Sequence, residues 1–253
     1  MNVILLASGK GKRLNPQTQN LPKPLVKVNK FSIFDFFLDS FNDIESEKTL
    51  YLATGYKEEC FQNNFYQKIF NPEYESTNML FGLWYTLSKL VNKFENTIIS
   101  YGDIIFPKPL LSELSKMDEI SIVTDPRWED NYIGRSEHGF DECEKCIVNE
   151  NKNLVIASKN LPKQFIKYFE YVGITYIPKR FMPRISELLN ELFIKTENLE
   201  KPFMFSESLK KAYITDFLSY LVMKNFQIRT KEIQGRWFEI DTIQDLEKAR
   251  GIY

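Results

Sequence analysis

Two basic motifs near the N-terminus have the residue types that bind a polyphosphate. The segment Ser8-Gly9-Lys10-Gly11-Lys12-Arg13 combines two glycines with three cations. Backbone N–H groups can approach an anion closely where no side chain intervenes, and the cations neutralise its charge. Further along, Leu21-Pro22-Lys23-Pro24-Leu25 holds one lysine between two prolines that stiffen the backbone. Together with the preceding strand, these two motifs predict a site for a polyphosphate.

The spacing of these glycines excludes two common nucleotide-binding loops. A Walker-type loop needs Gly-x-x-x-x-Gly-Lys-Ser/Thr, which the residues after Gly9 do not supply. The dinucleotide pattern Gly-x-Gly-x-x-Gly fails because Leu14 stands where its third glycine belongs. The alternative that needs no ligand is a basic surface loop followed by a proline turn.

Two aspartates each stand at the end of a predicted strand. Asp103 follows the apolar run 97–101, and Asp241 follows the run 237–240. Ligands of open α/β sheets gather at the carboxyl ends of the strands, and carboxylates placed there can hold Mg²⁺ against phosphate oxygens. For either aspartate alone, a turn or a helix cap is the alternative reading, and Asp241 could cap a helix beginning near Thr242.

The elements that position these side chains alternate along the chain. The first strand is a buried apolar run at 2–7, and a strand–helix–strand order of this kind produces a parallel sheet. Apolar periodicity predicts further strands at 49–54, 97–101, 120–124, 153–158, 171–177, 226–233 and 237–241. It predicts helices at 31–41, 57–65, 79–90, 181–193, 209–224 and 244–250. The polar stretch 128–153 reads as a loop or lid with a β-hairpin.

The composition favours a globular protein with a small anionic ligand. A net charge of −1 argues against a general nucleic-acid binder, and no run approaches the length of a membrane span. The N-terminus does not read as a signal peptide. Three cysteines indicate a reducing cytoplasm. Cys143-Glu144-Lys145-Cys146 has metal-site spacing, but only Cys60 and His138 remain as further ligands, so we interpret these thiols as incidental.

Taken together, the motifs resemble those of the nucleotidyltransferases that act on sugar phosphates and related phosphoesters. That family opens with a strand, then Ala-Ala/Ser-Gly-x-Gly-x-Arg and a Pro-Lys-Pro/Ala turn, matched by residues 7–13 and 22–24. Its two metal-binding aspartates have settings that match Asp103 and the segment 237–242. The resemblance implies a Rossmann-like three-layer α/β/α fold with a mostly parallel central sheet and a small β/lid insertion. It implies a single domain over 1–253, an acceptor-side lid at roughly 125–178, and no C-terminal β-helix.

The middle of the chain is similar to the cytidylyltransferase branch that activates phosphocholine and aminoalkyl phosphonates. The matching segments are 71–84, 158–159, 170–174 and 212–216. This similarity implies Mg²⁺-dependent transfer of CMP from CTP to a small phosphate or phosphonate acceptor, with release of pyrophosphate. A homodimer is left open. The alternatives are a sugar-1-phosphate nucleotidyltransferase that uses dTTP or UTP, and a catalytically inactive nucleotide-sensing relative.

The resemblance also implies roles for individual residues. The catalytic set is Lys23, Arg13, Asp103 and Asp241, and the metal ligands are Asp103, Asp241 and Glu239. The nucleotide-binding candidates are Leu6, Ala7, Ser8, Gly9, Lys10, Gly11, Lys12, Gly55, Tyr56, Asn78 and Ser100. The acceptor-binding candidates are Lys159, Glu170, Tyr171, Gly173, Asp216, Trp128 and Trp84.

Two kinds of acceptor pocket follow from these candidates. Aromatic faces could form a cage for a quaternary ammonium, with the side chains of Trp84, Tyr101, Trp128, Tyr171 and Trp237 near the expected site. Alternatively, Asp216 could pair with a primary amine or a hydroxyl. Most aromatic residues at apolar spacing belong to a core, so packing is the alternative for each ring.

Overall fold

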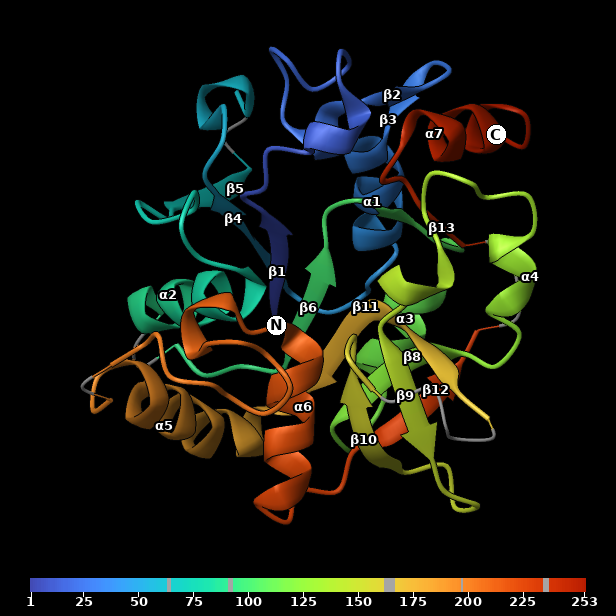
Figure 1. The fold of residues 1–253 in the computed structure, drawn as a ribbon. Helices are drawn as coiled ribbons and strands as arrows, with labels where there is room; N and C mark the ends of the chain where they lie inside the picture. The colour runs from blue at the N-terminus through green and yellow to red at the C-terminus, as the bar shows by residue number, and fades with distance from the viewer. Residues whose placement is uncertain (63–64, 91–92, 162–166, 197, 234–236) are drawn as a thin grey trace.

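A mixed nine-stranded sheet runs through the molecule (Figure 1). The structure is a computed structural model that describes residues 1–62, 65–90, 93–161, 167–196, 198–233 and 237–253. At the centre, β1 (Asn2–Ala7) pairs in parallel with β4 (Thr49–Thr54) and with β6 (Thr97–Tyr101). Beyond β4, β5 (Tyr66–Phe70) continues the parallel order, and β11 (Phe169–Ile177) runs antiparallel to β6. The predicted α/β fold with a mostly parallel central sheet is confirmed.

The long strand β11 joins the parallel part of the sheet to an antiparallel extension. It pairs with β6 and β9 (Lys145–Val148), and also with β8 (Ser121–Asp125). The hairpin partner of β9 is β10 (Leu154–Ser158), and β12 (Arg229–Glu232) runs parallel to β8. The hairpin predicted within 128–153 thus forms partly later in the chain, and it extends the central sheet.

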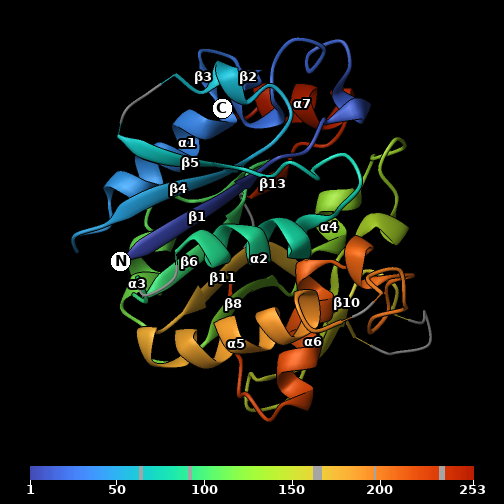
Figure 2. The same ribbon diagram turned by 90° about the vertical axis from the view of Figure 1, so that its left-hand side faces the viewer.

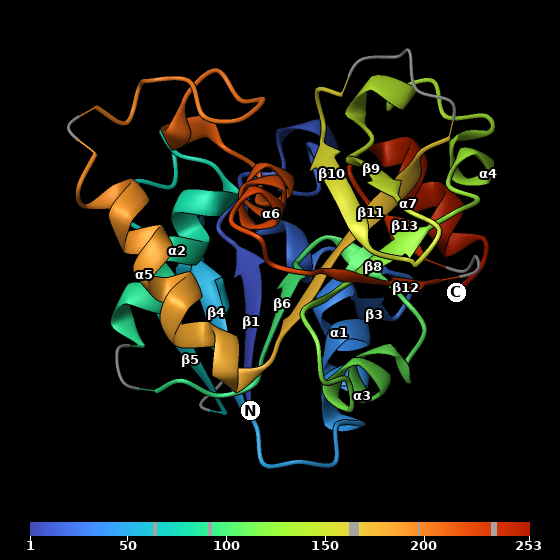
Figure 3. The same ribbon diagram turned by 90° about the horizontal axis from the view of Figure 1, so that it is seen from below.

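Helices cover both faces of the parallel strands and complete the three layers (Figures 2 and 3). On one side lie α1 (Ile33–Asn42) and α3 (Leu110–Ser115), and on the other lie α2 (Met79–Lys89), α5 (Met182–Phe193) and α6 (Ile214–Met223). Within the described residues, none of the helices is long and apolar enough to cross a membrane.

Local sequence explains where these helices begin and what they bury. In α1, the side chains of Ser32 and Asp35 form a capping box, which satisfies the first backbone N–H groups. Phe34, Phe37 and Phe41 recur at helical spacing and are buried in the core. The burial of this stripe is the main reason that α1 packs against the sheet.

Short elements complete the described chain. They are η1 (Lys12–Leu14), η2 (Lys23–Leu25), β2 (Lys27–Val28), β3 (Phe31–Ser32), η3 (Glu58–Cys60), β7 (Ile104–Ile105), α4 (Glu129–Tyr132), η4 (Phe140–Glu142), η5 (Lys179–Phe181), η6 (Leu209–Lys211), β13 (Phe238–Glu239) and α7 (Ile243–Arg250).

Two predicted helices differ from the structure. Among the described residues of 57–65, the predicted helix is wrong beyond the one 3-10 turn of η3; residues 63–64 lie outside the described residues. The edge strand β5 that follows was not predicted. The helix predicted at 209–224 is divided into η6 and α6. It breaks because Asp216 forms a capping box with Tyr213, which starts a new helix at Ile214.

Gly173 lies in β11 where the chain passes directly over an aromatic ring. Its φ of +86° favours glycine, and a Cβ built there would lie 2.5 Å from Cδ2 of Tyr101. We expect Gly173→Ala to lower the free energy of unfolding by about 3 kcal/mol, from backbone strain and the clash. Urea denaturation measures this change. Gly139→Ala is the control, because Gly139 has a negative φ and a Cβ added to it would meet nothing within 4 Å. An equal loss of unfolding free energy in both variants would contradict the prediction.

Candidate active site

A two-stranded ribbon brings together the two aspartates that sequence analysis singled out. β7 follows Asp103 directly and pairs antiparallel with β13, which precedes Asp241. The backbone N–H of Ile240 donates to the carbonyl of Asp103 at 2.9 Å. Asp241 does not cap α7, because the side chain of Thr242 does so. The Asp241 carboxylate therefore stays available to other partners.

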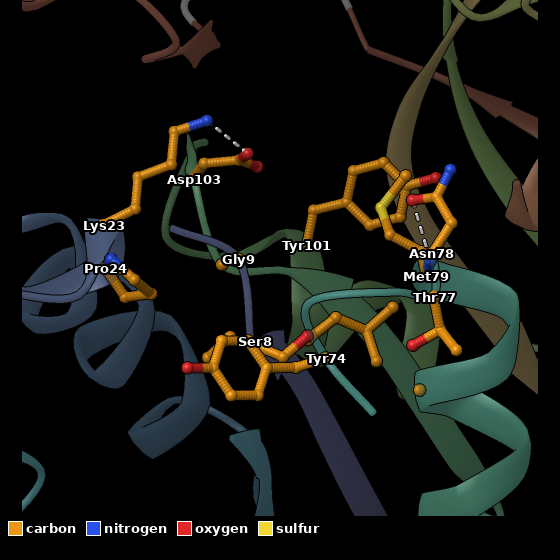
Figure 4. A pocket seen from close by; sticks show the side chains of 14 residues that line it. Ser8, Gly9, Lys23, Pro24, Tyr74, Thr77, Asn78, Met79, Tyr101 and Asp103 are labelled. Atoms are coloured by element: carbon orange, nitrogen blue, oxygen red, sulfur yellow. Dashed lines mark hydrogen bonds and ion pairs between the residues drawn. The ribbon is translucent and has the colours of Figure 1, made fainter. Parts of the chain in front are cut away.

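Lys23 lies between the two carboxylates. The turn η2 begins after Pro22 and directs the lysine inward. Its Nζ donates to Oδ2 of Asp103 at 2.6 Å, as Figure 4 shows, and also to Oδ1 of Asp241. Burial opposes the charge on Lys23, yet the carboxylates of Asp103 and Asp241 raise its pKa well above the ordinary value. The lysine is thus a fixed cation at the carboxyl ends of β1 and β6.

Arg13 extends this ion-pair network toward the segment between β8 and β9. Its Nη2 lies 2.7 Å from Oδ2 of Asp241, and its Nη1 lies 3.3 Å from Oε2 of Glu142. The same Oε2 accepts from Nζ of Lys159 at 2.6 Å. Burial raises the pKa of Asp241, but Lys23 and Arg13 together hold it well below its ordinary value. Glu142 therefore links the two cations Arg13 and Lys159.

Two adjoining cavities meet at Lys23 and Asp103. The first, of about 150 Å³, lies between the ends of β1 and β6 and the start of α2 (Figure 4). It is lined by Leu6, Ala7, Ser8, Gly9, Lys23, Pro24, Tyr74, Thr77, Asn78, Met79, Gly82, Tyr101, Gly102 and Asp103. The second, of about 280 Å³, is lined by Gly9, Gly11, Lys12, Arg13, Lys23, Asp103 and Asp241. One cavity is mostly uncharged and the other is rich in cations, which suits a nucleoside joined to a phosphate chain.

Asn78 caps α2 and also faces the first cavity (Figure 4). Its Oδ1 accepts from the backbone N–H of Met79 at 2.9 Å, and its Nδ2 donates to the carbonyl of Lys211 at 2.9 Å. Its amide orientation is therefore fixed. Thr77 and Tyr74 also line this cavity and were missed by sequence reasoning.

Four nucleotide-binding candidates lie outside both cavity linings among the described residues. Lys10 forms an ion pair with Glu75 at 2.6 Å, and the Tyr56 hydroxyl donates to backbone carbonyls of the loop after η1. Ser100 is buried within β6. A Cβ at Gly55 would lie 2.6 Å from the side chain of Tyr74. Glycine at this position therefore leaves room for the tyrosine side chain.

The carboxylates offer a fitting set of ligands for a divalent cation. Oδ1 of Asp103 is buried and has no hydrogen-bond partner among the described residues. Burial and the charges of Asp241 and Asp103 raise the pKa of Glu239 well above its ordinary value, as expected where carboxylates crowd together. Oxygen ligands of this kind are those that Mg²⁺ prefers.

His138 joins this group of acids and was not predicted as a site residue. It lies 3.3 Å from Oδ2 of Asp241 through Nδ1 and 3.6 Å from Oε2 of Glu239 through Nε2. Burial and the charge of Arg135 lower its pKa to about 4, so the ring is neutral at pH 7. No local pattern marked this histidine, because only the fold brings residue 138 beside residues 239 and 241.

A third, small cavity of about 10 Å³ has Glu239 in its lining. It is lined by Tyr101, Ile104, Glu142, Glu144, Glu170, Tyr171, Val172, Trp237 and Glu239. Burial raises the pKa of Glu144 and of Glu170 to about 7. Tyr101 donates to Glu144 at 2.9 Å, and Tyr132 donates to Glu170 at 2.6 Å. This cavity thus gathers the carboxyl groups of Glu142, Glu144 and Glu170 beside that of Glu239, one of the expected metal ligands.

The raised pKa of Glu170 predicts a dependence of stability on pH. In the unfolded chain this carboxyl loses its proton near pH 4.5, whereas in the folded chain it does so near pH 7. The folded state binds the extra proton between these values, so its stability falls as the pH rises through this window. We expect Glu170→Gln to raise the free energy of unfolding at pH 8 by about 2 kcal/mol and to change it little at pH 4.5. Urea denaturation at both pH values measures this. Glu150→Gln in an exposed turn is the control, and a shift of the same size at both pH values in Glu170→Gln would show that deprotonation of this carboxyl is not the cause.

Only two of the seven acceptor candidates, Glu170 and Tyr171, line one of these cavities, and three of the others are committed to contacts elsewhere in the fold. Asp216 accepts from the backbone of Tyr213 at 3.0 Å and from the hydroxyl of Ser206 at 2.6 Å, so it is used in capping α6. Trp84 donates to Asn190 of α5 at 3.0 Å. Trp128 donates to the carbonyl of Tyr168 and packs in a separate cluster. The structure therefore does not bring the five aromatic residues of the expected cage together.

The other acceptor candidates lie closer to the carboxylate pair. Glu170 and Tyr171 line the small cavity, and Lys159 is bound to Glu142 at its edge. The Tyr171 hydroxyl is paired with that of Thr175 at 2.7 Å, and its ring packs edge-on against that of Tyr101. Gly173 allows the backbone of β11 to pass close to the ring of Tyr101, where a Cβ would clash.

Comparison with known proteins agrees with this arrangement. The nucleotidyl transferase family model matches residues 2–105, which include the glycine loop, Lys23 and Asp103. The resemblance to the nucleotidyltransferase family is thereby confirmed.

Two relatives are similar over nearly their whole length. The chain is 26% identical over 257 residues to a CTP:phosphoglutamine cytidylyltransferase from Campylobacter jejuni, covering 98% of each protein. It is 21% identical over 257 residues to a choline-phosphate cytidylyltransferase from Streptococcus pneumoniae, covering 100% of this chain and 98% of the relative. The chain is thus similar to two cytidylyltransferases along nearly its whole length.

Solved structures share the fold. A CTP:phosphocholine cytidylyltransferase from Streptococcus pneumoniae superposes with a TM-score of 0.72 at 18% identity, over 99% of this chain and 98% of the other. An inositol-1-phosphate CTP transferase from T. maritima gives 0.68 at 21% identity, over 99% and 94%. These likenesses establish the three-layer fold.

Proposed function

We propose that this protein is a Mg²⁺-dependent cytidylyltransferase that transfers CMP from CTP to a small phosphate or phosphonate acceptor. The observation that carries the proposal is the placement of Lys23 between Asp103 and Asp241, where the two cavities meet. A cytidylyltransferase relative at 26% identity over the chain supports the choice of base. We treat residues 1–253 as one catalytic unit with its acceptor side near 125–178.

The nucleotide is proposed to bind across the two cavities. The first cavity takes the base and ribose, with Asn78 and Thr77 as polar partners. The second takes the phosphate chain, with backbone groups near Gly9 and Gly11 and the cations Arg13 and Lys23. Positioning and charge neutralisation are the main tasks of the protein, because both reactants are anions.

The reaction is an in-line displacement at the α-phosphorus. An acceptor oxygen forms the new P–O bond, the bond from the α-phosphorus to the bridging oxygen breaks, and its electron pair leaves with pyrophosphate. The acceptor oxygen is already anionic at neutral pH, so no general base is needed. Lys23 and Arg13 stabilise the charge that builds on the phosphate oxygens in the transition state.

Mg²⁺ would be held by Asp103 and Asp241, with Glu239 beside them. When bound, the cation acts as a Lewis acid that neutralises phosphate oxygens. Lys159 is the proposed partner of the acceptor phosphate. Its pKa is raised, because the carboxylate of Glu142 outweighs the opposing effect of burial. A phosphate that binds Lys159 replaces Glu142 as its anionic partner.

Pyrophosphate release with Mg²⁺ tests this proposal. The assay combines each of the four nucleoside triphosphates with phosphocholine, phosphoethanolamine, 2-aminoethylphosphonate, phosphoglutamine, glycerol phosphates, inositol 1-phosphate and several sugar 1-phosphates. Turnover with CTP and a small phosphate or phosphonate is the expected result. Turnover only with dTTP or UTP and a sugar 1-phosphate would overturn the assignment of base and acceptor. Nucleotide binding without turnover on any acceptor would favour a nucleotide-sensing protein.

A further inference from the structure

His138 is a buried histidine whose two ring nitrogens make no hydrogen bond. The residue is 1% exposed, and neither Nδ1 nor Nε2 has a hydrogen-bond partner among the described residues. A buried polar atom without a partner costs free energy, and a ligand that engages it recovers part of that cost. The neighbours of this ring therefore indicate which ligand it suits.

Carboxylates lie beside both nitrogens of the ring. Oδ2 of Asp241 lies 3.3 Å from Nδ1, and Oε2 of Glu239 lies 3.6 Å from Nε2. One ligand atom from each of these three residues lies within 4.8 Å of the other two. Ligand atoms around a single divalent cation are roughly 3 to 4 Å apart, since each bond is about 2.1 Å long. Small side-chain rotations would therefore bring the three groups into one coordination sphere.

The loop that carries His138 is anchored to the segment that carries Asp241. Between α4 and η4, the backbone N–H of Ser136 donates to Oε1 of Gln244 at 2.8 Å. Nε2 of Gln244 in turn donates to the carbonyl of Gly134 at 2.9 Å. Gln244 belongs to α7, which begins two residues after Asp241. The histidine and the aspartate are thus held together in advance, so little conformational freedom is lost when both bind one ion.

Two arginines border this group, and each has an acidic partner outside it. Nε of Arg135 lies 2.7 Å from Oδ1 of Asp245, and its Nη2 approaches the group only to 4.0 Å. Arg13 donates to Oδ2 of Asp241, and it also lies 3.3 Å from Glu142. Arg13 therefore keeps an anionic partner when a metal ion takes its place at Asp241.

The two carboxylate oxygens of Asp241 have different neighbours. Oδ1 accepts from Lys23, which also donates to Asp103, whereas Oδ2 lies beside His138. Asp103 is not one of the three grouped residues. An ion bound by the imidazole would therefore use a different oxygen of Asp241 from the one that faces Lys23 and Asp103.

We propose that His138, Glu239 and Asp241 bind a divalent transition-metal ion, at a site separate from the Asp103 side of Asp241. This site goes beyond the Mg²⁺ pair of the proposed function. An imidazole nitrogen suits transition metals, whereas Mg²⁺ prefers oxygen ligands alone. With one ring nitrogen on the ion, the other can donate to a neighbouring carboxylate, an arrangement that orients metal-binding histidines.

Pulsed electron paramagnetic resonance of bound Mn²⁺ tests the site without nucleotide and without activity. The protein is prepared free of metal and without an affinity tag, and its sequence contains one histidine. We expect a tightly bound Mn²⁺ that couples to an imidazole nitrogen, which then belongs to His138. Zn²⁺ should displace this ion, whereas an excess of Mg²⁺ of about 10-fold should not. Bound Mn²⁺ without the coupling, no saturable binding of Mn²⁺, or displacement by that excess of Mg²⁺ would each overturn the inference.

Variants separate this site from the Asp103 side. His138→Gln should abolish the nitrogen coupling, and both it and Glu239→Gln should weaken the tightest Mn²⁺ binding at least about 10-fold, a loss that occurs even when a group only supports a ligand. Asp103→Asn should retain the coupling, and Asp39→Asn, at an exposed carboxylate, should change nothing. Unchanged Mn²⁺ affinity in His138→Gln, or loss of the coupling in Asp103→Asn, would overturn the inference. The coupling in the original protein remains a test if a variant fails to fold.

Pyrophosphate release distinguishes this inference from the proposed function. CMP transfer with Mg²⁺ by a protein that binds no Mn²⁺ through imidazole would leave the proposed function standing and overturn the metal site. Imidazole coupling in a protein that transfers CMP to no acceptor would support the site and count against the proposed function.

Discussion

Asp103→Asn is expected to lower kcat for pyrophosphate release by about 1,000-fold while the protein remains folded. The substitution removes one of the two charges proposed to hold Mg²⁺, and losses of this size are typical when a preorganised charge at a reacting phosphate is removed. Asparagine keeps an oxygen that can accept from Lys23, which retains its second partner, Asp241. Steady-state kinetics at several Mg²⁺ concentrations measure the effect, and a higher Mg²⁺ requirement should accompany the lower rate.

Asp39→Asn is a matched control for this prediction. Asp39 is exposed and pairs with Lys108 at 2.9 Å on the surface of the molecule. Its replacement should leave both kcat and the Mg²⁺ requirement unchanged, because exposed ion pairs contribute little. An Asp103→Asn variant with more than about one tenth of the original kcat would remove Asp103 from the proposed metal site.

Lys23→Met is expected to affect both rate and stability. Removal of the ammonium leaves Asp103 and Asp241 facing each other without the cation between them, and breaking a buried pair in this way typically costs about 3 kcal/mol. The same change removes a cation proposed to stabilise the transferring phosphate, so kcat should fall by at least about 100-fold. Urea denaturation and pyrophosphate release measure the two effects.

Mg²⁺ provides an additional test of the Lys23 variant. A divalent cation should stabilise Lys23→Met against unfolding more than it stabilises the original protein, because it replaces the missing charge between the two carboxylates. Lys30→Met, at an exposed lysine, serves as the control and should respond to Mg²⁺ as the original protein does. A Lys23→Met variant as stable as the original protein in the absence of Mg²⁺ would show that the ion pair contributes little to the fold.

Local patterns were enough to predict the elements and motifs nearest the N-terminus. Stretches of a few residues suffice there: the apolar run predicts β1, and the glycines and the two prolines around Lys23 predict the turns that follow it. Asp103 and Asp241 were found in the same way, since each follows a recognisable apolar run. The structure places these carboxylates on either side of Lys23, a relation that no local pattern contains.

Residues whose place depends on tertiary packing were not predictable. Glu142, Glu144 and His138 come from a polar stretch without periodicity, and the fold brings them to the site through β9 and its neighbouring loops. Conversely, Asp216 and Trp84 lie in segments that match the cytidylyltransferase branch, but their side chains have structural partners. Asp216 caps α6, and Trp84 of α2 donates to Asn190 of α5. A motif identifies a segment, but it does not reveal which hydrogen bonds a side chain already makes.

The ribbon of β7 and β13 has a consequence for synthesis of the chain on the ribosome. Asp241 is separated from Lys23 by 218 residues and from Arg13 by 228 residues, although its carboxylate accepts hydrogen bonds from both side chains. The N-terminal strands, Lys23 and Asp103 emerge early, and the second carboxylate emerges more than 130 residues after Asp103. A nascent chain that has reached Asp103 therefore holds Arg13, Lys23 and the first carboxylate, but lacks Asp241. The full set of groups can assemble only after the segment that carries Asp241 has been synthesised.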